Sequence, residues 1–218
     1  DAPTLGSLID PDIGVSKGSM FEAKWDKVGP LLAKVLSRER DDEKAEMGVI
    51  ARGISRASLM MAKGYHLLFT NVPYLVRGKH DELLKAYLES HYPDGKHDLA
   101  YAFLRRCIQY LSKSGNAVIV LPENWLYINP CKKLRQGLID EFELTFLARL
   151  GPGAFQTITG EVVKSLLFSI TNKNPTVGHL FFGIDCWSVQ GADEKSNCLQ
   201  TIEVQLISQA DQAQNPDC

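Results

Sequence analysis

The chain has 218 residues, of which 44% are hydrophobic and 23% are charged, and this composition is typical of a globular protein whose core forms without a structural metal. Its formal net charge of −2 excludes a basic surface spread over the whole protein, so any contact with nucleic acid must be local. The five cysteines stand at wide, irregular spacings with no CxxC pair, which favours reduced thiols in a cytoplasmic protein over a disulfide framework or a zinc ribbon.

The first 63 residues are expected to be a helical segment. The stretch SMFEAKWDKVGPLLAKVL, residues 19–36, has apolar residues at helical spacing but contains Gly29 and Pro30, so it predicts two short helices with a break between them. Residues 40–64 have the pattern of a long amphipathic helix that begins with acids and ends at Gly64, as the helix dipole and glycine stop signals favour.

From residue 65 onward, short apolar runs alternate with helical patterns. Helices are expected at residues 81–92, 96–115 and 129–142, and strands at residues 65–71, 116–122, 144–150, 164–172 and 180–184. Such alternation is typical of an α/β fold in which a parallel sheet carries helices on both faces. The last strands follow one another without a helix, which predicts an antiparallel hairpin at the edge of the sheet.

Three parts are therefore expected along the chain. Residues 1–63 are the helical segment, residues 64–183 form the core, and residues 184–218 are a polar, turn-rich tail that leads toward a further domain. The chain begins with Asp1 rather than methionine and ends in a loop-like stretch, so we expect it to be a piece of a longer protein.

The stretch TNVPYL, residues 70–75, places a polar and aromatic turn at the end of the first buried strand. Ligands of open α/β sheets bind beyond the carboxyl ends of the strands. The Asn71 side-chain oxygen and the Val72 carbonyl can accept hydrogen bonds from a planar amine, Pro73 fixes the turn, and Tyr74 can stack on a ring. From these four residues alone, a capping asparagine beside a packed tyrosine is the better explanation of the turn.

The turn resembles the NPPY-type catalytic motif of amino-group DNA methyltransferases, with Val72 in place of the first proline. Two later stretches, DLAYAFLRRCIQYLSKSGNAVIVLPENWL and FLARLGPGAFQTITGEVVKSLLFSITNK, resemble the segments that follow this motif in the same family. Together they make the chain similar to N6-adenine-specific DNA methyltransferases of the Eco57I-like and phage-exclusion PglX-like type, over residues 64–173 above all.

This resemblance implies the C-terminal part of a Rossmann-like, S-adenosylmethionine-dependent methyltransferase sheet. It implies methylation of adenine N6 in double-stranded DNA after the base is flipped out, within a cytoplasmic restriction-modification or phage-defence complex. Asn71 and the Val72 carbonyl would then hold the amine, and Tyr74 would stack on the base. Phe168 or Phe155 would pack against another edge of the base.

One family feature is missing from the sequence. The glycine-rich cofactor turn should precede the catalytic motif, but residues 1–63 contain no strand followed by GxG, and GPGAF at residues 151–155 comes too late. We therefore expect the S-adenosylmethionine site to lie mostly outside the chain, and the chain to be inactive by itself.

Other polar residues give weaker signals. Asn124 or Glu123, in LPENWL at a second strand end, is a candidate for lining the pocket. Basic residues close to the turn are candidates for contacts with DNA phosphates, although a solvated basic face explains them equally well; these residues are Arg77, Lys79 and Lys96. The histidines near acids match no familiar ligand spacing, so no metal site is expected and they are interpreted as polar loop residues; they are His80, His91 and His97.

Two alternative functions are compatible with the same residues. Enzymes that methylate RNA or a protein glutamine can share the NPPY-type turn. A segment that only recognises DNA, or docks a partner within a restriction or phage-defence complex, would need no chemistry at all.

Overall fold

The computed structural model describes residues 2–11, 30, 34, 42–155 and 163–215. The chain divides into two compact units, Asp1–Gly64 and Tyr65–Cys218. In the first unit, α1 (Ala2–Leu5) is followed by the 3₁₀ helix η1 (Gly6–Leu8), and α3 (Asp42–Met61) is the long helix predicted for residues 40–64. Most of the two short helices predicted for residues 19–36 lies outside the described residues.

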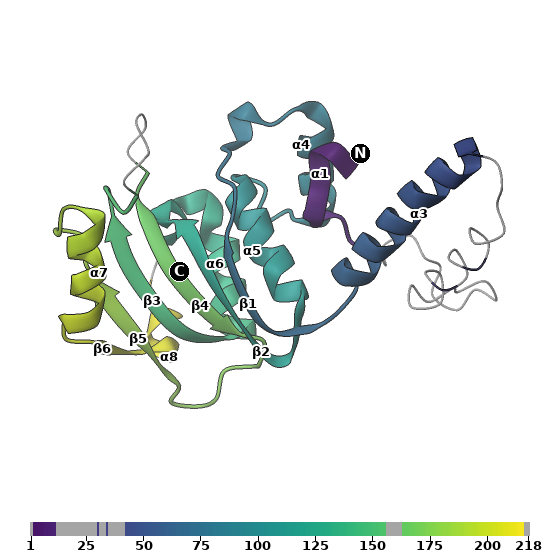
Figure 1. Ribbon diagram of the computed structural model, residues 1–218. Coiled ribbons are helices and arrows are strands. Elements are labelled where there is room, and N and C mark those ends of the chain that lie inside the picture. The colour runs from purple at the N-terminus through teal and green to yellow at the C-terminus, as the bar shows by residue number, and fades with distance from the viewer. Residues whose placement is uncertain (1, 12–29, 31–33, 35–41, 156–162, 216–218) are drawn as a thin grey trace. The chain divides into compact units, whose positions relative to one another are not determined.

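The second unit is built on a six-stranded mixed sheet with the order β1-β2-β4-β3-β5-β6 (Figure 1). The β1–β2 and β3–β5 pairs are parallel, and the remaining neighbours are antiparallel. The strands are β1 (Tyr65–Asn71), β2 (Leu111–Pro122), β3 (Glu143–Gly151), β4 (Ser165–Thr171), β5 (Leu180–Asp185) and β6 (Gln205–Ser208).

Helices connect the strands and cover both faces of the sheet, as predicted. They are α4 (Glu82–His91), α5 (Leu99–Gln109), α6 (Lys132–Glu141), α7 (Ala192–Thr201) and α8 (Gln209–Gln212), with 3₁₀ turns η2 (Arg77–Lys79), η3 (Glu123–Leu126) and η4 (Asn129–Cys131). Aspartates begin two of them: the Asp81 carboxylate accepts from the Leu84 N–H, and the Asp98 carboxylate accepts from the Ala100 N–H. These bonds satisfy backbone donors that the first turn leaves open.

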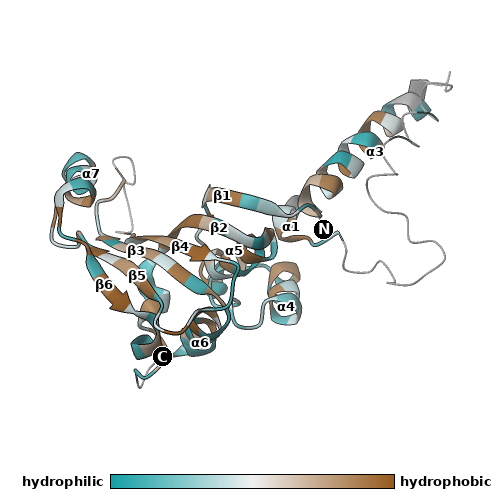
Figure 2. Cartoon of the chain, turned by 90° about the horizontal axis from the view of Figure 1, so that it is seen from below, coloured by the Kyte–Doolittle hydropathy of each residue, from teal (hydrophilic) through white to brown (hydrophobic). Residues whose placement is uncertain are grey.

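The larger hydrophobic core lies between the sheet and the helices α5 and α6. It joins the inward side chains of β2 and β4, among them Ile119, Phe168 and Ile170, to Leu104 of α5 and Leu138 of α6. A smaller cluster on the other face joins β3 and β5 to α7, and Figure 2 shows α6 and α7 on opposite sides of the strands.

The second strand begins earlier than the sequence pattern predicts. Residues 111–115 were predicted as the end of a helix, but α5 ends at Gln109 and Leu111 already pairs with Tyr65. A register shift between Tyr65 and Leu67 brings the two strands close together. A Cβ on Gly115 would lie 2.6 Å from the Tyr65 carbonyl oxygen, so only glycine permits this approach.

The prediction of an antiparallel edge hairpin from the last two predicted strands is wrong: β3 lies between β4 and β5, and the antiparallel β3–β4 pair lies inside the sheet. There β4 pairs with β2 on one side and with β3 on the other. The edge is β6, antiparallel to β5, and it belongs to residues 184–218, which the sequence pattern assigns to a polar tail.

The other edge strand among the described residues is β1, and it is unusually apolar on one side. Its only described neighbour is β2. Leu67 and Phe69 point to the same face and are 57% and 69% exposed, whereas Leu68 packs against the core.

The expectation of reduced cysteines is wrong for one pair. Cys186, after β5, is disulfide-bonded to Cys198 in α7. The spacing of 12 residues does not predict this disulfide, because the two cysteines meet only when the fold brings α7 back over the end of β5. Cys107 and Cys131 are free and buried, and burial raises their pKa to about 12 and about 11.

No helix in the described parts of the chain has the length and apolar character needed to cross a membrane.

Candidate active site

The predicted catalytic turn stands at the carboxyl end of β1. Asn71 is the last residue of the strand, pairs in register with Val120 of β2, and is exposed. Val72 is 5% exposed and belongs to the main hydrophobic core. Its side chain therefore anchors the turn to the hydrophobic core, whereas the neighbouring Pro73 is exposed.

Backbone hydrogen bonds hold the turn at Leu75. The Leu75 N–H donates to the Asp98 carboxylate at 3.2 Å, and the Leu75 carbonyl accepts from the Leu99 N–H at 2.9 Å. The same carbonyl accepts from His80 Nε2 at 2.7 Å, which requires that this nitrogen carry a proton. His80 lies in a loop, as predicted, but it is buried and its ring braces the turn.

The Tyr74 ring is half-buried, and its hydroxyl is turned inward. Burial raises the pKa of Tyr74 to about 12, with Ser165 lowering it and the Asp98 carboxylate adding to the rise. The hydroxyls of Tyr74 and Ser165 are both buried, and neither forms a hydrogen bond of normal geometry with another described residue. They are polar groups that a bound molecule can satisfy.

A cavity of about 470 Å³ opens beside the turn. Of the predicted site residues, Tyr74, Lys79 and Asn124 line it; Asn71 does not, although it stands at the adjacent strand end. The lining residues are Tyr74, Leu75, Val76, Lys79, Asp98, Pro122, Asn124, Val163 and Lys164. The ends of β1 and β2 and the start of β4 thus surround a space of the size that a small ring system requires.

The predicted phosphate contacts differ in their surroundings. Lys79 is exposed at the cavity. Arg77 is engaged by the Glu89 carboxylate, and the hydrogen bond and charge of Arg77 lower the pKa of Glu89. Lys96 is half-buried, and its charge adds to burial in lowering the pKa of His97.

The two phenylalanines proposed for the base pocket do not line the cavity. Phe168 is fully buried in the core, with its ring 5.3 Å from that of Trp125 in an edge-to-face arrangement. Phe155 is half-buried beyond the end of β3, just before residues 156–162, which lie outside the described part of the chain.

Two charged side chains that the sequence pattern did not single out, Arg149 and Asp185, lie along the same edge of the sheet beside the candidate Glu123, which does not line the cavity. Arg149, near the end of β3, is 3.0 Å from the Asp185 carboxylate at the end of β5 and 3.8 Å from that of Glu123, after β2. Glu123 is only 3% exposed, and burial raises its pKa while Arg149 opposes the rise. The available signal was their position: each stands at the carboxyl end of a predicted strand.

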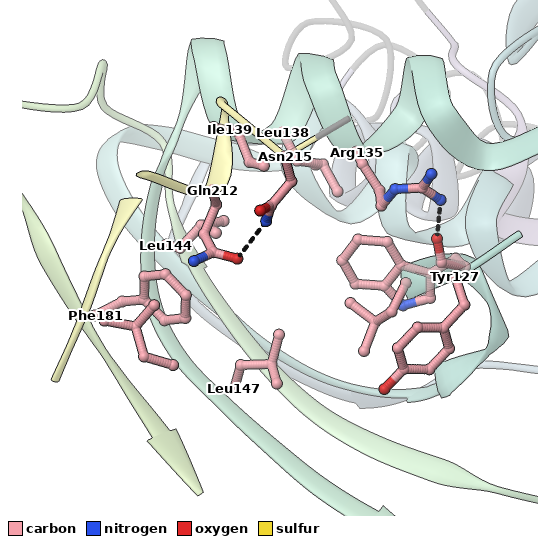
Figure 3. A pocket seen from close by; sticks show the side chains of 12 residues that line it. Tyr127, Arg135, Leu138, Ile139, Leu144, Leu147, Phe181, Gln212 and Asn215 are labelled. Atoms are coloured by element: carbon pink, nitrogen blue, oxygen red, sulfur yellow. Dashed lines mark hydrogen bonds between the residues drawn. The ribbon is translucent and has the colours of Figure 1, made fainter. Parts of the chain in front are cut away.

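A second cavity of about 380 Å³ lies on the α6 side of the sheet and is mainly apolar (Figure 3). Leu138, Leu147 and Phe181 contribute to its wall. Arg135 donates to the Trp125 carbonyl at 2.6 Å, so its guanidinium supports the wall. None of the predicted site residues lines this cavity.

Among the described residues, no group of three or more histidine, cysteine or acidic side chains could hold a metal ion.

The sheet, with α5 and α6 on one face, α7 on the other and β4 inserted antiparallel between β2 and β3, is that of a Rossmann-like methyltransferase. Within this class, residues 20–155 match the family model described as Eco57I restriction-modification methylase. The chain therefore belongs to the Eco57I restriction-modification methylase family.

Three known proteins illustrate the similarity. The adenine-specific methyltransferase PglX of Lacticaseibacillus casei (strain Zhang) is 30% identical over 177 residues, which cover 78% of this chain and 14% of that protein. The adenine-specific methyltransferase BrxX of Escherichia coli O9:H4 (strain HS) is 27% identical over 173 residues, 79% of this chain and 14% of that protein. The chain thus spans about one seventh of the length of these relatives.

A solved structure shares the fold. The ATP-dependent Type ISP restriction-modification enzyme LlaBIII bound to DNA superimposes with a TM-score of 0.53 at 17% identity, over 72% of this chain and 13% of that chain. At this identity the likeness shows the fold alone.

Proposed function

We propose that the chain is the catalytic segment of a longer S-adenosylmethionine-dependent DNA methyltransferase that modifies adenine N6 in a restriction-modification or phage-defence system. The observation that carries the proposal is the Asn71–Tyr74 turn, held at the carboxyl end of β1 beside a cavity of about 470 Å³. The names of PglX and BrxX, both adenine-specific methyltransferases, support the same activity.

The chemistry assigned to the turn is the activation of an amine. The lone pair of adenine N6 is delocalised into the ring, which makes the nitrogen a poor nucleophile. Acceptors at the Asn71 side-chain oxygen and the Val72 carbonyl would draw both amine hydrogens and direct the lone pair outward. The buried Val72 side chain supports this role because it fixes the position of its own carbonyl.

The rest of the cavity suits a flat heteroaromatic base. Tyr74 offers a half-buried ring for stacking, and its buried hydroxyl forms no hydrogen bond of normal geometry with a described residue, although Ser165 lies close enough to lower its pKa. Asn124 and Lys79 add polar groups at the rim. A base in a duplex is out of reach of such a cavity, so the proposed substrate is DNA with the target adenine flipped out.

The proposed reaction also needs a site for the methyl donor. A glycine-rich turn after a strand is the feature that would cradle it, and GPG after β3 is the only such sequence in residues 42–155 and 163–215. A Cβ on Gly151 would lie 2.8 Å from the indole ring of Trp187, so the ring already occupies this approach. We propose that S-adenosylmethionine, which would supply the methyl group, binds mainly outside this chain, and that the chain alone is inactive.

The test is Asn71→Ala in the longer enzyme. Loss of one acceptor should lower the methylation rate at least ~100-fold, comparable with removal of one oxyanion donor elsewhere, while DNA affinity stays unchanged. Incorporation of labelled methyl groups into DNA measures the rate, and a gel-shift titration measures the affinity.

The matched control is Asn129→Ala, which removes the same side chain from an exposed position in η4 and should leave the rate unchanged. An Asn71→Ala enzyme that methylates at the wild-type rate contradicts the catalytic assignment. A wild-type enzyme that methylates RNA or a glutamine-containing peptide but not DNA contradicts the substrate assignment and favours the alternatives.

A further inference from the structure

A second group of side chains extends the same edge of the sheet away from the cavity. Strand register fixes the order of the residues there. Pro122 at the end of β2 pairs with Ser165, Ser165 pairs with Gly151 of β3, and Arg149 pairs with Asp185 of β5. Lys164, which precedes β4, and Trp187, which follows β5, therefore stand on the edge that carries the catalytic turn.

Trp187 is held in place from several directions. The backbone N–H of Trp187 donates to the Asp185 carboxylate at 2.9 Å. The backbone N–H of the preceding Cys186 donates to the Arg149 carbonyl at 2.9 Å. The Gly151 backbone lies directly against the indole, leaving no space for a Cβ. Such an immobilised aromatic ring, half-buried at a sheet edge, costs little further entropy when it binds a partner.

Arg149 braces this ring and carries little free charge. Its guanidinium lies 4.9 Å from the Trp187 ring centroid and 5.6 Å from that of Tyr127. The carboxylates of Asp185 and Glu123 balance the charge of Arg149. We therefore assign Arg149 a positioning role and not a direct contact with a ligand.

Lys164 differs from Arg149 in its environment. It is exposed, lines the cavity, and places its ammonium nitrogen 4.9 Å from the Trp187 ring centroid. Its charge opposes the rise in the pKa of the buried Glu123 carboxyl, but none of the ion pairs between described residues includes Lys164. The ammonium group of Lys164 therefore lies between the cavity and the Trp187 indole, where it can bind an anion.

We propose that Lys164 and Trp187 form a subsite for the nucleotide next to the base in the cavity, with Lys164 contacting its phosphate and Trp187 stacking on its base. The inference rests on the proposed function, because the cavity must hold a base. A cation beside a flat aromatic ring matches the two chemical parts of a nucleotide, its phosphate and its base. When a phosphate binds the ammonium on its flexible stem, the ring face beneath becomes available to the base.

The test uses the 218-residue chain and a fluorescently labelled single-stranded oligodeoxyadenylate, whose bases need no extrusion. Anisotropy titrations over a series of salt concentrations give the affinity and its salt dependence. Lys164→Ala should lower the slope of log K against log salt by about 0.7, the value for one lost phosphate contact on a single strand. Trp187→Ala should lower the affinity about fivefold or more without changing the slope, and Trp187→Phe should retain most of the affinity.

Lys113→Ala is the matched control, because Lys113 is an exposed lysine near the opposite end of β2; its affinity and slope should equal those of the wild type. A wild-type slope and affinity in Lys164→Ala, or no binding by the wild-type chain, overturns the subsite. Lys164 is exposed, so its variant stays informative even if Trp187→Ala loses its fold. The proposed function fails separately, when Asn71→Ala still methylates, and that result leaves this binding test unaffected.

Discussion

At the residue scale, the buried carboxyl of Glu123 should make the stability of the chain depend on pH. It is 3% exposed, its Oε2 atom lacks a hydrogen-bond partner among the described residues, and Arg149 lies 3.8 Å away. Burial raises its pKa above the ordinary value of 4.5. The folded chain therefore keeps this proton over a pH range in which the unfolded chain has lost it, and the stability so gained is lost as pH rises through the folded pKa.

Glu123→Gln should therefore stabilise the chain more at neutral than at acid pH. The amide stays uncharged, so the variant avoids the cost of ionising a buried carboxyl. The measurement is the free energy of urea unfolding at about pH 4 and about pH 7, with the exposed Glu203→Gln as control. A difference from the wild type that does not grow with pH would show that Glu123 ionises without cost in the folded chain.

At the scale of the element, the turn after β1 and the start of α5 form one structure. The Asp98 carboxylate accepts from Ala100 N–H at 3.0 Å, which begins the helix, and from Leu75 N–H at 3.2 Å, which holds the turn. One side chain therefore connects the proposed catalytic turn to a helix that packs on the core.

Asp98→Ala should lower the free energy of unfolding by about 1–2 kcal/mol through the lost helix cap, and it should also lower methylation by the longer enzyme. Asp81→Ala is the matched control: it removes the equivalent cap of α4, a bond of 2.7 Å to Leu84 N–H, but touches no part of the turn. We expect chemical denaturation to show similar losses of stability, and methyl-transfer assays to show a loss only for Asp98→Ala. Equal activity in the two variants would contradict the positioning role.

Elements were predicted well where one physical signal dominated. The long helix α3 and the strand β1 follow from periodicity, and so does the position of α5, although α5 ends at Gln109 and not at Gly115. The sequence pattern missed β6, because four residues in a polar region carry too little alternation to distinguish a strand from a loop. It misplaced the start of β2 because the pairing of Leu111 with Tyr65 depends on a partner 46 residues away.

At the scale of the whole molecule, the position of the TNVPYL turn at a strand end could be predicted from the sequence. The face of the sheet to which the Phe168 side chain points could not. TNVPYL could be placed because a motif and a strand end coincide. Phe168 could not, because SLLFSIT shows no regular alternation of apolar and polar residues and β4 is covered on both faces. Only its ladders with β2 and β3 decide that Leu166, Phe168 and Ile170 point into the core.

The exposed side of β1 has a consequence for the behaviour of the chain in solution. A strand with a free edge and two protruding apolar side chains, Leu67 and Phe69, is a template on which another copy can add a strand. Concentrated preparations of the 218-residue chain should therefore form assemblies larger than the monomer. Changing both residues to lysine should keep the chain monomeric, as light scattering after gel filtration would measure.

Val177→Lys provides the comparison, because it removes an even more exposed apolar side chain from a loop without altering the edge. If both variants dissolve to the same extent, general surface hydrophobicity and not the strand limits solubility. If only the Leu67 and Phe69 changes act, colloidal stability depends on β1, and any longer protein that contains this chain must shield that strand to remain dispersed.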